Sequence, residues 1–592
     1  MKRIIRKLSK EELLVIFLSP ISIFVMTQFV YNGGLNSYNL GIIIANYLCI
    51  TFVFMLILLI SNKVLLSSIL SHIIFLVWAI ANYFVSLYRG NPVLPWDLTA
   101  LGTAKDVFMN YKYYPTLAMI ISIIYIIGLA YFLSRYLPKG HYNYKYFNRS
   151  LAMCLMIASF ILIGSPKKVE AYGVRTDVWN PAKAYRENGT IATFIANLKF
   201  LKVEKPENYD NVDVIMNNYE DKWDNVSDIK PNIIAIMNES WADYEEFGNL
   251  KLKNSVMDNI KSIDNIYFGH TYTSVYGAGT SASEFEFLTG NTMAFLPSGS
   301  IPYQQYILSP SSSIASILKE QGYSTNAFHP GDINSWNRNK AYPLLGFDGF
   351  KSREDMDVII KETHSEYVSD KSNFDQLIYD YEHRDKTKPY FYFNVTIGSH
   401  GGYTDKTYPN QNKILGHANE FEKAEEYLTL LEETDIAFKE LIDYFKTVNE
   451  PVIILMFGDH QPSLEAEFNE LAYGVKQDKM NMQAYMNKFR TPYVMWANYD
   501  LDIKEDKDTS LNFLGQKLLY YAGVETNEYG KYLWDFKDKI NALSFVGYHN
   551  GIKAYSHLEN NRYTKKIKEY QAIQYNNLFG DDARNDEFFK VN

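Results

Sequence analysis

Cysteine is nearly absent from this chain, whose 592 residues contain only Cys49 and Cys154. Both cysteines lie inside long apolar runs. The part of the chain after residue 165 therefore has no disulfide and no catalytic thiol, which excludes disulfide-stapled domains and cysteine-nucleophile enzymes. This part must fold on a hydrophobic core of its own, and it is long enough to do so.

Acidic residues are scarce at the start of the chain. Residues 1–165 contain four Asp and Glu against 13 Lys and Arg, a net charge of +9. Because the whole chain carries −9, residues 166–592 carry −18. Such an acidic surface repels polyanions, so we expect no nucleic-acid partner.

Long apolar runs occupy most of residues 1–165. A helix of about 20 apolar residues crosses the hydrocarbon of a bilayer, and most of the runs reach that length. We therefore predict a five-span membrane domain over residues 1–165, in which the first run is not a cleaved signal peptide because further spans follow it at once. The predicted spans, of which the last is the shortest, are 12–31, 37–61, 64–88, 116–137 and 149–165.

The distribution of cations predicts the orientation of these spans. With the N-terminus in the cytoplasm, the inner segments hold ten Lys and Arg, whereas the outer loops hold only Arg89, Lys105 and Lys112. This asymmetry follows the positive-inside rule. We therefore expect a multi-pass protein of the cell membrane whose residues after about 166 are extracellular. A cleavage near 169–173 that releases this part stays open.

The extracellular part reads as an α/β domain. After a charged juxtamembrane connector at 166–230, with an amphipathic helix near 181–202, apolar strands alternate with helical segments over 231–548; a tail at 549–592 carries no motif. Continuous apolar strands separated by helices predict a mainly parallel central sheet covered on both faces. The predicted strands are 232–239, 325–330, 390–397, 451–460 and 491–498, and the predicted helices are 312–321, 371–383 and 419–447.

Polar residues follow the apolar runs at three places. Glu239 ends the first strand, and Asp459 and His460 end the run "ILMFGDH". Thr280 follows Gly277 and Gly279 and opens a helix that ends at Gly290. Carboxylate and imidazole groups are good ligands for divalent metals, and a metal-activated threonine hydroxyl attacks phosphorus. Since functional groups gather at the carboxyl ends of parallel strands, we expect a metal site there.

Structural interpretations compete with this one. Ser281 and Glu284 match an S-x-x-E capping box that any helix could use. An Asp-His pair after a strand is also compatible with an ordinary polar turn. Together, however, the four residues favour a site over a set of unrelated turns.

These residues resemble the lipoteichoic acid synthase family, which are membrane phosphoglycerol transferases of the alkaline phosphatase and sulfatase superfamily. The resemblance covers nearly the whole chain and includes the loop "RGNPVLPWDL" at 89–98. It implies a single divalent ion, Mn²⁺ or alternatively Mg²⁺ or Zn²⁺, and Thr280 as the nucleophile. The ligands it implies are Glu239, Thr280, Asp459 and His460.

The resemblance also implies substrate contacts. The segment "SWNRNKAY" is similar to a family motif whose Trp and Arg bind phosphate and glycerol, which gives Trp336 and Arg338. His329 in "FHPGD" and His400 in "TIGSHGGY" match family histidines. For each residue a plainer role stays open: a solvated loop arginine, a core tryptophan, or structural histidines. The Gly-Gly-Tyr that follows His400 departs from the founding enzymes and leaves the acceptor open.

Two related chemistries are disfavoured by the motifs. Sulfatases form their nucleophile within C/S-x-P-x-R, whereas Thr280 is followed by "SASE". Two-metal phosphatases commonly use D-x-x-x-H, and none of the 11 histidines has an Asp four residues before it. A one-metal enzyme is therefore the better fit.

The expected activity is transfer of glycerol phosphate from phosphatidylglycerol to a glycolipid or teichoic-acid-type acceptor of a Gram-positive cell wall. It would proceed through a glycerophosphoryl-threonine intermediate. The alternatives are a phosphoethanolamine transferase, a glycerol-phosphate transferase acting on a wall polysaccharide or glycolipid, and a membrane-anchored binding protein with a dead site. The donor headgroup, the acceptor, the polymer length, the ion and the oligomeric state stay open.

Overall fold

The computed structural model contains two compact units, a helical unit within residues 1–203 and an α/β unit formed by Glu204–Leu296 and Ser300–Asn592. The structure describes residues 5–6, 8–34, 36, 38–89, 92–100, 113–138, 143–144, 146–176, 181–403, 405, 408, 411–503 and 508–591.

Among the described residues of the helical unit, four helices are long and apolar enough to cross a membrane. A fifth helix follows at the position of the last predicted span, α6 (Tyr146–Ile163), but its described apolar part, Ala152–Ile163, is shorter than a crossing requires. Four predicted spans are therefore confirmed as membrane-capable helices, and the fifth crossing stays a prediction. The four helices are α1 (Lys10–Asn32), α2 (Leu40–Ser61), α3 (Val64–Arg89) and α5 (Leu117–Tyr136).

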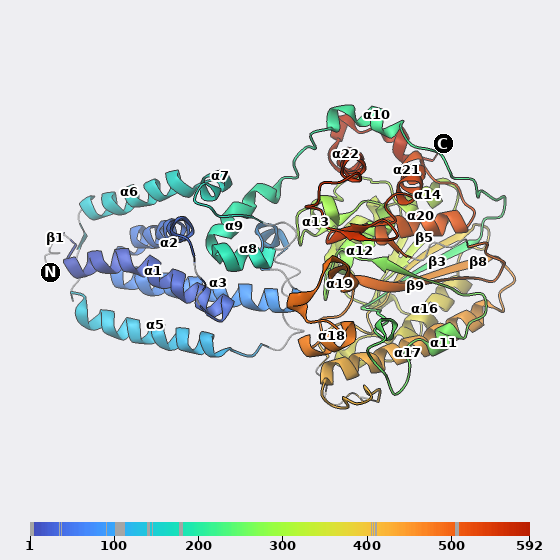
Figure 1. Cartoon of the computed structure of the whole chain (residues 1–592), viewed down its shortest axis with the longest axis horizontal. Coiled ribbons are helices and arrows are strands. Elements are labelled where there is room, and N and C mark those ends of the chain that lie inside the picture. The colour runs from blue at the N-terminus through green and yellow to red at the C-terminus, as the bar shows by residue number, and fades with distance from the viewer. Residues whose placement is uncertain are drawn as a thin grey trace. The chain divides into compact units, whose positions relative to one another are not determined.

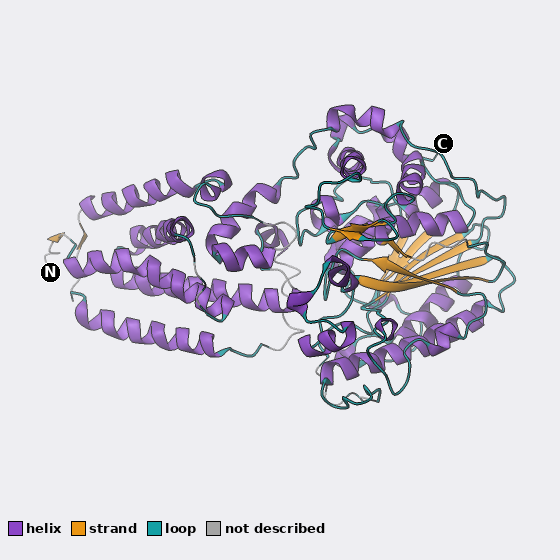
Figure 2. Cartoon of the chain, in the orientation of Figure 1, coloured by secondary structure: helices purple, strands orange, loops and turns teal. Residues whose placement is uncertain are grey.

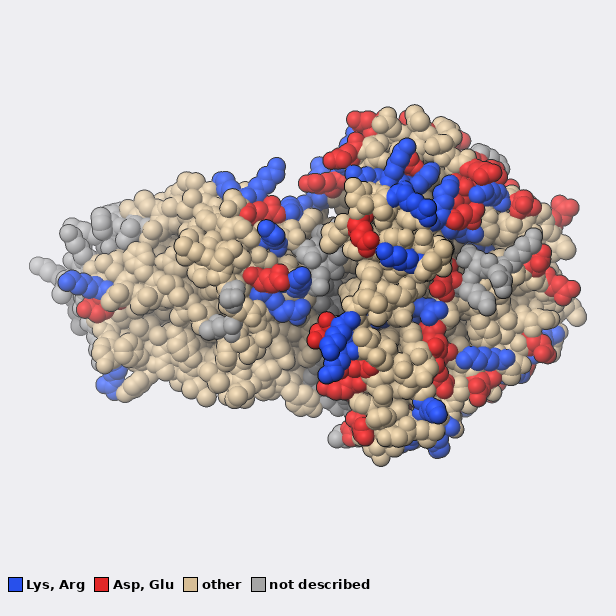
Figure 3. All heavy atoms as spheres, viewed as in Figure 1, with Lys and Arg blue, Asp and Glu red and all other residues tan. Residues whose placement is uncertain are grey.

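Polar side chains between α1 and α3 satisfy one another. The hydroxyls of Ser19 and Ser68 lie 2.9 Å apart, and Ser22 Oγ lies 2.7 Å from His72 Nε2. Such pairs hold helices together where no water is available. On the face shown in Figure 3, charged side chains are few over the helical unit and numerous over the α/β unit. Seven of the cations used to orient the spans lie outside the described residues, namely Lys2, Arg3, Lys7, Lys105, Lys112, Lys139 and Lys145.

The α/β unit is built around an eight-stranded sheet (Figures 1 and 2) with the order β10-β4-β9-β8-β3-β7-β5-β6. Every neighbouring pair is parallel except the two that involve β9, which runs against β4 and β8. The predicted mainly parallel sheet is confirmed. The strands are β3 (Asn232–Asn238), β4 (Tyr267–Tyr272), β5 (Ser324–Phe328), β6 (Gly349–Lys351), β7 (Tyr390–Val395), β8 (Val452–Gly458), β9 (Arg490–Ala497) and β10 (Asp508–Ser510).

Helices cover both faces of this sheet. One layer contains α11 (Asp258–Lys261), α16 (Asp370–Glu382) and α17 (Glu422–Phe445), and the opposite layer contains α12 (Thr280–Thr289), α14 (Ile314–Glu320) and α20 (Leu511–Tyr521) (Figure 1). Every residue of β3, β7 and β8 is buried, because both faces of a central parallel strand lie under helices. The five predicted strands and three predicted helices all occur within a few residues of their expected bounds.

The predicted helix at 181–202 is wrong as a single element. It is divided into α8 (Pro181–Asn188) and α9 (Thr190–Asn197) at Gly189, whose φ is +82°. A Cβ on Gly189 would lie 2.6 Å from the Asn46 side chain, so the break lets the two chain segments approach closely.

The C-terminal part of the chain packs within the α/β unit. The helix α22 (Thr564–Phe579) places Tyr570 and Ile573 in a buried cluster with Leu533 of α21 (Glu528–Lys537) and Met216 of α10 (Val212–Met216). A small antiparallel sheet lies beside it, formed by β11 (Ala542–Ser544), β12 (Gly547–His549) and β13 (Ala554–Tyr555). Residues from the predicted connector and from the predicted tail thus contribute to one core.

Candidate metal centre and active site

Glu239, Asp459 and His460 lie at the ends of two neighbouring strands. In the parallel pair β3 and β8, Asn238 is opposite Gly458. The residues that follow both strands therefore emerge at one point of the carboxyl edge of the sheet. Parallel sheets in general gather their functional groups at this edge.

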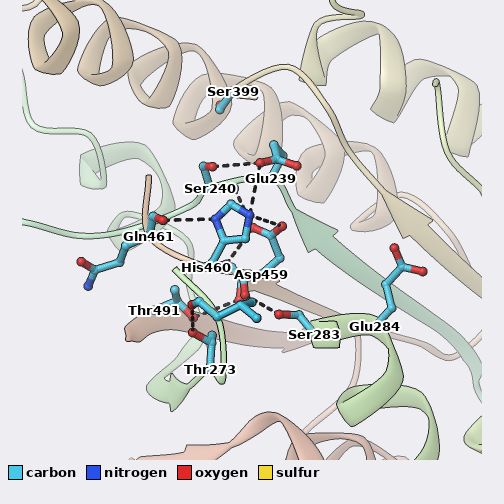
Figure 4. A network of polar contacts seen from close by, with 12 residues as sticks. Glu239, Ser240, Thr273, Ser283, Glu284, Ser399, Asp459, His460, Gln461 and Thr491 are labelled. Atoms are coloured by element: carbon cyan, nitrogen blue, oxygen red, sulfur yellow. Dashed lines mark hydrogen bonds and ion pairs between the residues drawn. The ribbon is translucent and has the colours of Figure 1, made fainter. Parts of the chain in front are cut away.

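The three side chains converge closely enough to bind one ion. Each offers a ligand atom, and these atoms all lie within 4.8 Å of one another. His460 Nε2 lies 3.2 Å from Asp459 Oδ2 and 3.8 Å from Glu239 Oε1 (Figure 4). All three residues are buried. The structure thus brings together three of the four predicted ligands.

Local hydrogen bonds hold these groups in place. Ser240, whose φ is +54°, donates its hydroxyl to Glu239 Oε1 at 2.9 Å and its backbone N–H to Asp459 Oδ1 at 2.7 Å. His460 Nδ1 lies 3.1 Å from the carbonyl oxygen of Gln461. Because a carbonyl only accepts, Nδ1 carries the proton and Nε2 presents its lone pair to the site.

The charges at this point call for a cation. Burial, together with the Asp459 carboxylate, raises the pKa of Glu239 to about 8. Asp459 Oδ2 is buried without a hydrogen bond from any described group. Two carboxylates and an imidazole lone pair form a donor set that suits Mn²⁺, Zn²⁺ and related divalent ions. The residues therefore fit a divalent metal site.

Thr280 is the first residue of α12, and the turn that it opens packs against the loop after β8. Gly277 and Gly279 precede it with φ values of +70° and +103°. Three residues further on, Ser283 donates its hydroxyl to the backbone carbonyl of Asp459 at 2.6 Å, and the N–H of Gly277 donates to Gln461 at 2.8 Å. Both glycines thus adopt the left-handed conformation that brings the helix N-terminus to the metal ligands.

The capping-box interpretation of Ser281 and Glu284 is wrong. The N-cap of α12 is Gly279, and no side chain caps the helix. Glu284 instead pairs with Arg338, whose Nη2 lies 2.5 Å from Glu284 Oε1. This role of Glu284 was not predicted from sequence, although a Glu within the apolar stretch of α12 was a usable signal, because an acid is rarely buried without a partner.

Arg338 is not a solvated loop arginine and Trp336 is not a core tryptophan, which were their plainer interpretations. Arg338 begins α15 (Arg338–Leu344) and is fully buried, so it is not a solvated loop residue. Its Nη1 has no hydrogen bond from or to a described group. Trp336 is only half-buried and has a φ of +58°, so it is not a core residue. A bulky residue in this conformation is strained, and such strain is typical of ligand sites.

The two predicted histidines are neutral and buried to different degrees. His329 follows β5, and its Nδ1 lies 3.1 Å from the carbonyl oxygen of Val395. Burial, with the nearby charge of Arg338 adding to it, holds the pKa of His329 well below its usual value. Burial also lowers the pKa of His400. Both rings are therefore unprotonated at neutral pH and can accept a proton.

Tyr367 is a further residue at this edge that the sequence analysis missed. Its ring centroid lies 5.1 Å from that of His400. Burial first, and then the charge of Glu239, raise the pKa of Tyr367 to about 12. No motif marks this tyrosine among the 48 in the chain, so only the fold could identify it.

Comparison with known proteins agrees with this geometry. The Sulfatase family model matches residues 231–524. A Rhizobium meliloti protein named for cyclic β-1,2-glucan modification is 30% identical over 70% of this chain and 65% of its own length. Lipoteichoic acid synthase 2 of Bacillus subtilis is 23% identical over 42% of this chain. The chain thus matches 65% and 38% of the lengths of these two relatives.

Two solved structures share the fold. Phosphoglycerol transferase GacH of Streptococcus pyogenes has a TM-score of 0.55 and 21% identity, and the match covers 66% of this chain and all of that one. The integral membrane phosphoethanolamine transferase EptA of Neisseria meningitidis has a TM-score of 0.51 and 13% identity, with 86% of this chain and 95% of that one covered. The second match extends the similarity to a membrane domain joined to an α/β domain.

Proposed function

We propose that this chain is a membrane-anchored phosphoglycerol transferase, because residues 231–524 match the Sulfatase family model and the chain is similar to a lipoteichoic acid synthase. It moves glycerol phosphate from phosphatidylglycerol to a hydroxyl of a glycolipid or teichoic-acid-type acceptor in the cell envelope. The catalytic domain lies outside the cytoplasm. Thr280 is the nucleophile, and Mn²⁺ is the ion.

One observation carries this proposal. Glu239, Asp459 and His460 converge at the carboxyl edge of the sheet, and the helix that begins at Thr280 is tied to the same loop through Ser283. Arg338 adds a buried guanidinium whose Nη1 has no hydrogen bond to a described group. A metal site, a hydroxyl at a helix N-terminus and a buried guanidinium suit phosphoryl transfer, which depends on positioning and electrostatic stabilisation.

The reaction is a double displacement. Thr280 Oγ forms a bond to phosphorus while the bond between phosphorus and the diacylglycerol oxygen breaks, and the threonine proton passes to the departing oxygen. An acceptor hydroxyl then attacks the glycerophosphoryl-threonine, which restores Thr280. A neutral His329 or His400 accepts and returns the proton in each half-reaction. Arg338 and the N-terminus of α12 stabilise the charge on the phosphoryl oxygens.

Glu239, Asp459, His460 and Thr280 would hold a divalent ion, which would lower the pKa of the threonine hydroxyl and offset negative charge. This compensation matters because the exported half of the chain carries −18 and repels anionic headgroups. Anchoring in the membrane of the donor lipid also raises the effective concentration of substrate.

Phosphoethanolamine transfer is the second candidate, and the similarity to EptA over 86% of the chain favours it. The solved structure of GacH, by contrast, contains sn-glycerol-1-phosphate. A glycerol-phosphate transferase acting on a wall polysaccharide is a further variant of the same chemistry. The intact ligand set argues against a binding protein with a dead site.

A donor assay tests the proposal. Purified full-length protein in detergent with Mn²⁺ receives phosphatidylglycerol or phosphatidylethanolamine, each with a fluorescent acyl chain. We expect Mn²⁺-dependent release of diacylglycerol from phosphatidylglycerol alone. Release of diacylglycerol from phosphatidylethanolamine alone would identify phosphatidylethanolamine as the donor in place of phosphatidylglycerol. No release from either lipid by a protein that binds Mn²⁺ would contradict the proposal.

A further inference from the structure

Both carboxylate oxygens of Glu284 accept hydrogen bonds from other side chains of the protein. Arg338 Nε donates to Oε1 at 2.9 Å and to Oε2 at 3.3 Å, and Tyr342 donates its hydroxyl to Oε2 at 2.7 Å. Together with the Nη2 contact, these bonds occupy one whole edge of the guanidinium. The opposite nitrogen, Nη1, is the only guanidinium nitrogen of Arg338 without a hydrogen bond to a described group.

Stability is a weak explanation for a buried ion pair of this kind. The two side chains are 1% and 0% exposed, so both charges have lost their hydration. Removing an ion from water costs several kcal/mol, and apolar residues of similar size are often as stable in such places. The more informative effect of the ion pair is that it fixes the position of the Arg338 guanidinium.

We infer that Glu284 is a positioning residue that holds one edge of Arg338 and thereby reserves Nη1 for a phosphoryl oxygen of the substrate. This inference rests on the proposed function of the site. A guanidinium recognises phosphate through a fixed fork, and a displacement of about 1 Å is enough to lose roughly 100-fold in rate. Glu284 supplies the fixed orientation that this recognition requires.

We also expect Glu284 to affect metal binding through Arg338. The charge of Arg338 acts on Glu239 and on His329. Without Glu284, the guanidinium would be a buried cation lacking its partner, and the ligand carboxylates would be its alternative partners. Arg338 would then compete with the metal ion. Loss of Glu284 should weaken metal binding through Arg338.

A double-mutant cycle in the full-length protein tests both effects. Glu284→Gln keeps the shape of the side chain and removes its charge. We expect kcat/KM for a chromogenic phosphodiester and for the lipid donor to fall about 100-fold. In the Arg338→Ala background the same substitution should have no further effect, because Glu284 acts only through Arg338. Mn²⁺ titration calorimetry should show weaker binding in Glu284→Gln and recovery in the double variant.

Glu286→Gln is the matched control. Glu286 lies on the same helix, is equally buried and does not contact Arg338; Ser274 and Thr292 donate to it instead. Its substitution should alter the melting temperature and should combine additively with Arg338→Ala. If Glu284→Gln fails to fold, Tyr342→Phe is the alternative variant, because it removes one hydrogen bond to Glu284. It should lower kcat/KM several-fold, and this effect should be absent in the Arg338→Ala background.

These experiments test the positioning role of Glu284 separately from the proposed lipid donor. Wild-type kcat/KM in folded Glu284→Gln, or additive effects with Arg338→Ala, would overturn the positioning role. Wild-type protein that cleaves the chromogenic diester but no phosphatidylglycerol would contradict the proposed donor and still allow the cycle to be measured. If neither substrate is cleaved, the Mn²⁺ titrations decide, since unchanged affinity in Glu284→Gln would also overturn the inference.

Discussion

Ser240 shows how one residue can define a metal centre. Its positive φ of +54° turns the chain so that its hydroxyl bonds to Glu239 and its N–H bonds to Asp459. Two carboxylates that would otherwise repel each other are thereby held toward one point. Since the strain of this conformation costs about 1–3 kcal/mol, it persists only where the surroundings enforce it.

Glu286 predicts a pH dependence of stability that is separate from catalysis. Burial raises its pKa to about 7, and only Oε1 accepts hydrogen bonds from described groups, namely Ser274, Thr292 and the N–H of Met293. Between pH 4.5 and 7 the folded protein keeps the proton and the unfolded chain loses it, so Glu286 contributes less to stability as pH rises. The full change is roughly 3 kcal/mol.

We expect Glu286→Gln to remove this contribution. Thermal unfolding of wild type and variant between pH 5 and pH 8 measures it, and the difference in melting temperature should shift in favour of the variant as pH rises. A difference that is constant over this range would show that Glu286 has an ordinary pKa in the folded protein.

At the scale of elements, the end of β8 is the most constrained position of the site. A Cβ on Gly458 would lie 2.1 Å from the backbone oxygen of Trp241, just before Asp459. Gly458→Ala should therefore push β8 away from the loop after β3 and separate the metal ligands. We expect at least a tenfold loss of Mn²⁺ affinity and roughly a 100-fold loss of activity.

Gly34→Ala is the control for this substitution, since a Cβ there meets nothing within 4 Å. Calorimetric Mn²⁺ titration and circular dichroism should show a folded Gly458→Ala protein with weakened binding and an unaffected Gly34→Ala protein. Wild-type Mn²⁺ affinity in Gly458→Ala would mean that the strand end does not set the ligand geometry.

Elements that are long, apolar and buried on both sides were predictable from sequence. β3, β7 and β8 are continuous apolar runs, and their bounds agree with the structure. β4 was missed because Gly269 and His270 interrupt its apolar pattern, and β6 and β10 have only three residues each. The reversed direction of β9 depends on pairing with distant strands, which local sequence does not encode.

The residues of the site also differ in how far they could be predicted from sequence. Residues directly after strands were found because strand ends are visible in sequence. Glu284 and Tyr367 were missed because their roles depend on partners that lie 54 and 33 residues away, Arg338 and His400. Contacts of this kind depend on tertiary packing, and sequence spacing does not predict them.

At the scale of the whole molecule, membrane topology is the first prediction. Five crossings place the N-terminus and the α/β unit on opposite sides, whereas four would place them on the same side. We expect five, so in intact spheroplasts external protease should digest a C-terminal tag and spare an N-terminal tag. Protection of both tags, or digestion of both, would show an even number of crossings and would place α6 outside the membrane.

We propose Thr280 as the covalent nucleophile, and trapping its phosphoryl adduct would identify the attacking residue. Full-length protein is mixed with Mn²⁺ and phosphatidylglycerol without acceptor, quenched in acid, digested and examined by mass spectrometry. The proposed role of Thr280 predicts a glycerophosphoryl group on the peptide that contains Thr280, no adduct in Thr280→Ala, and no diacylglycerol release by that variant. Diacylglycerol release by folded Thr280→Ala, or an adduct on another residue, would contradict it.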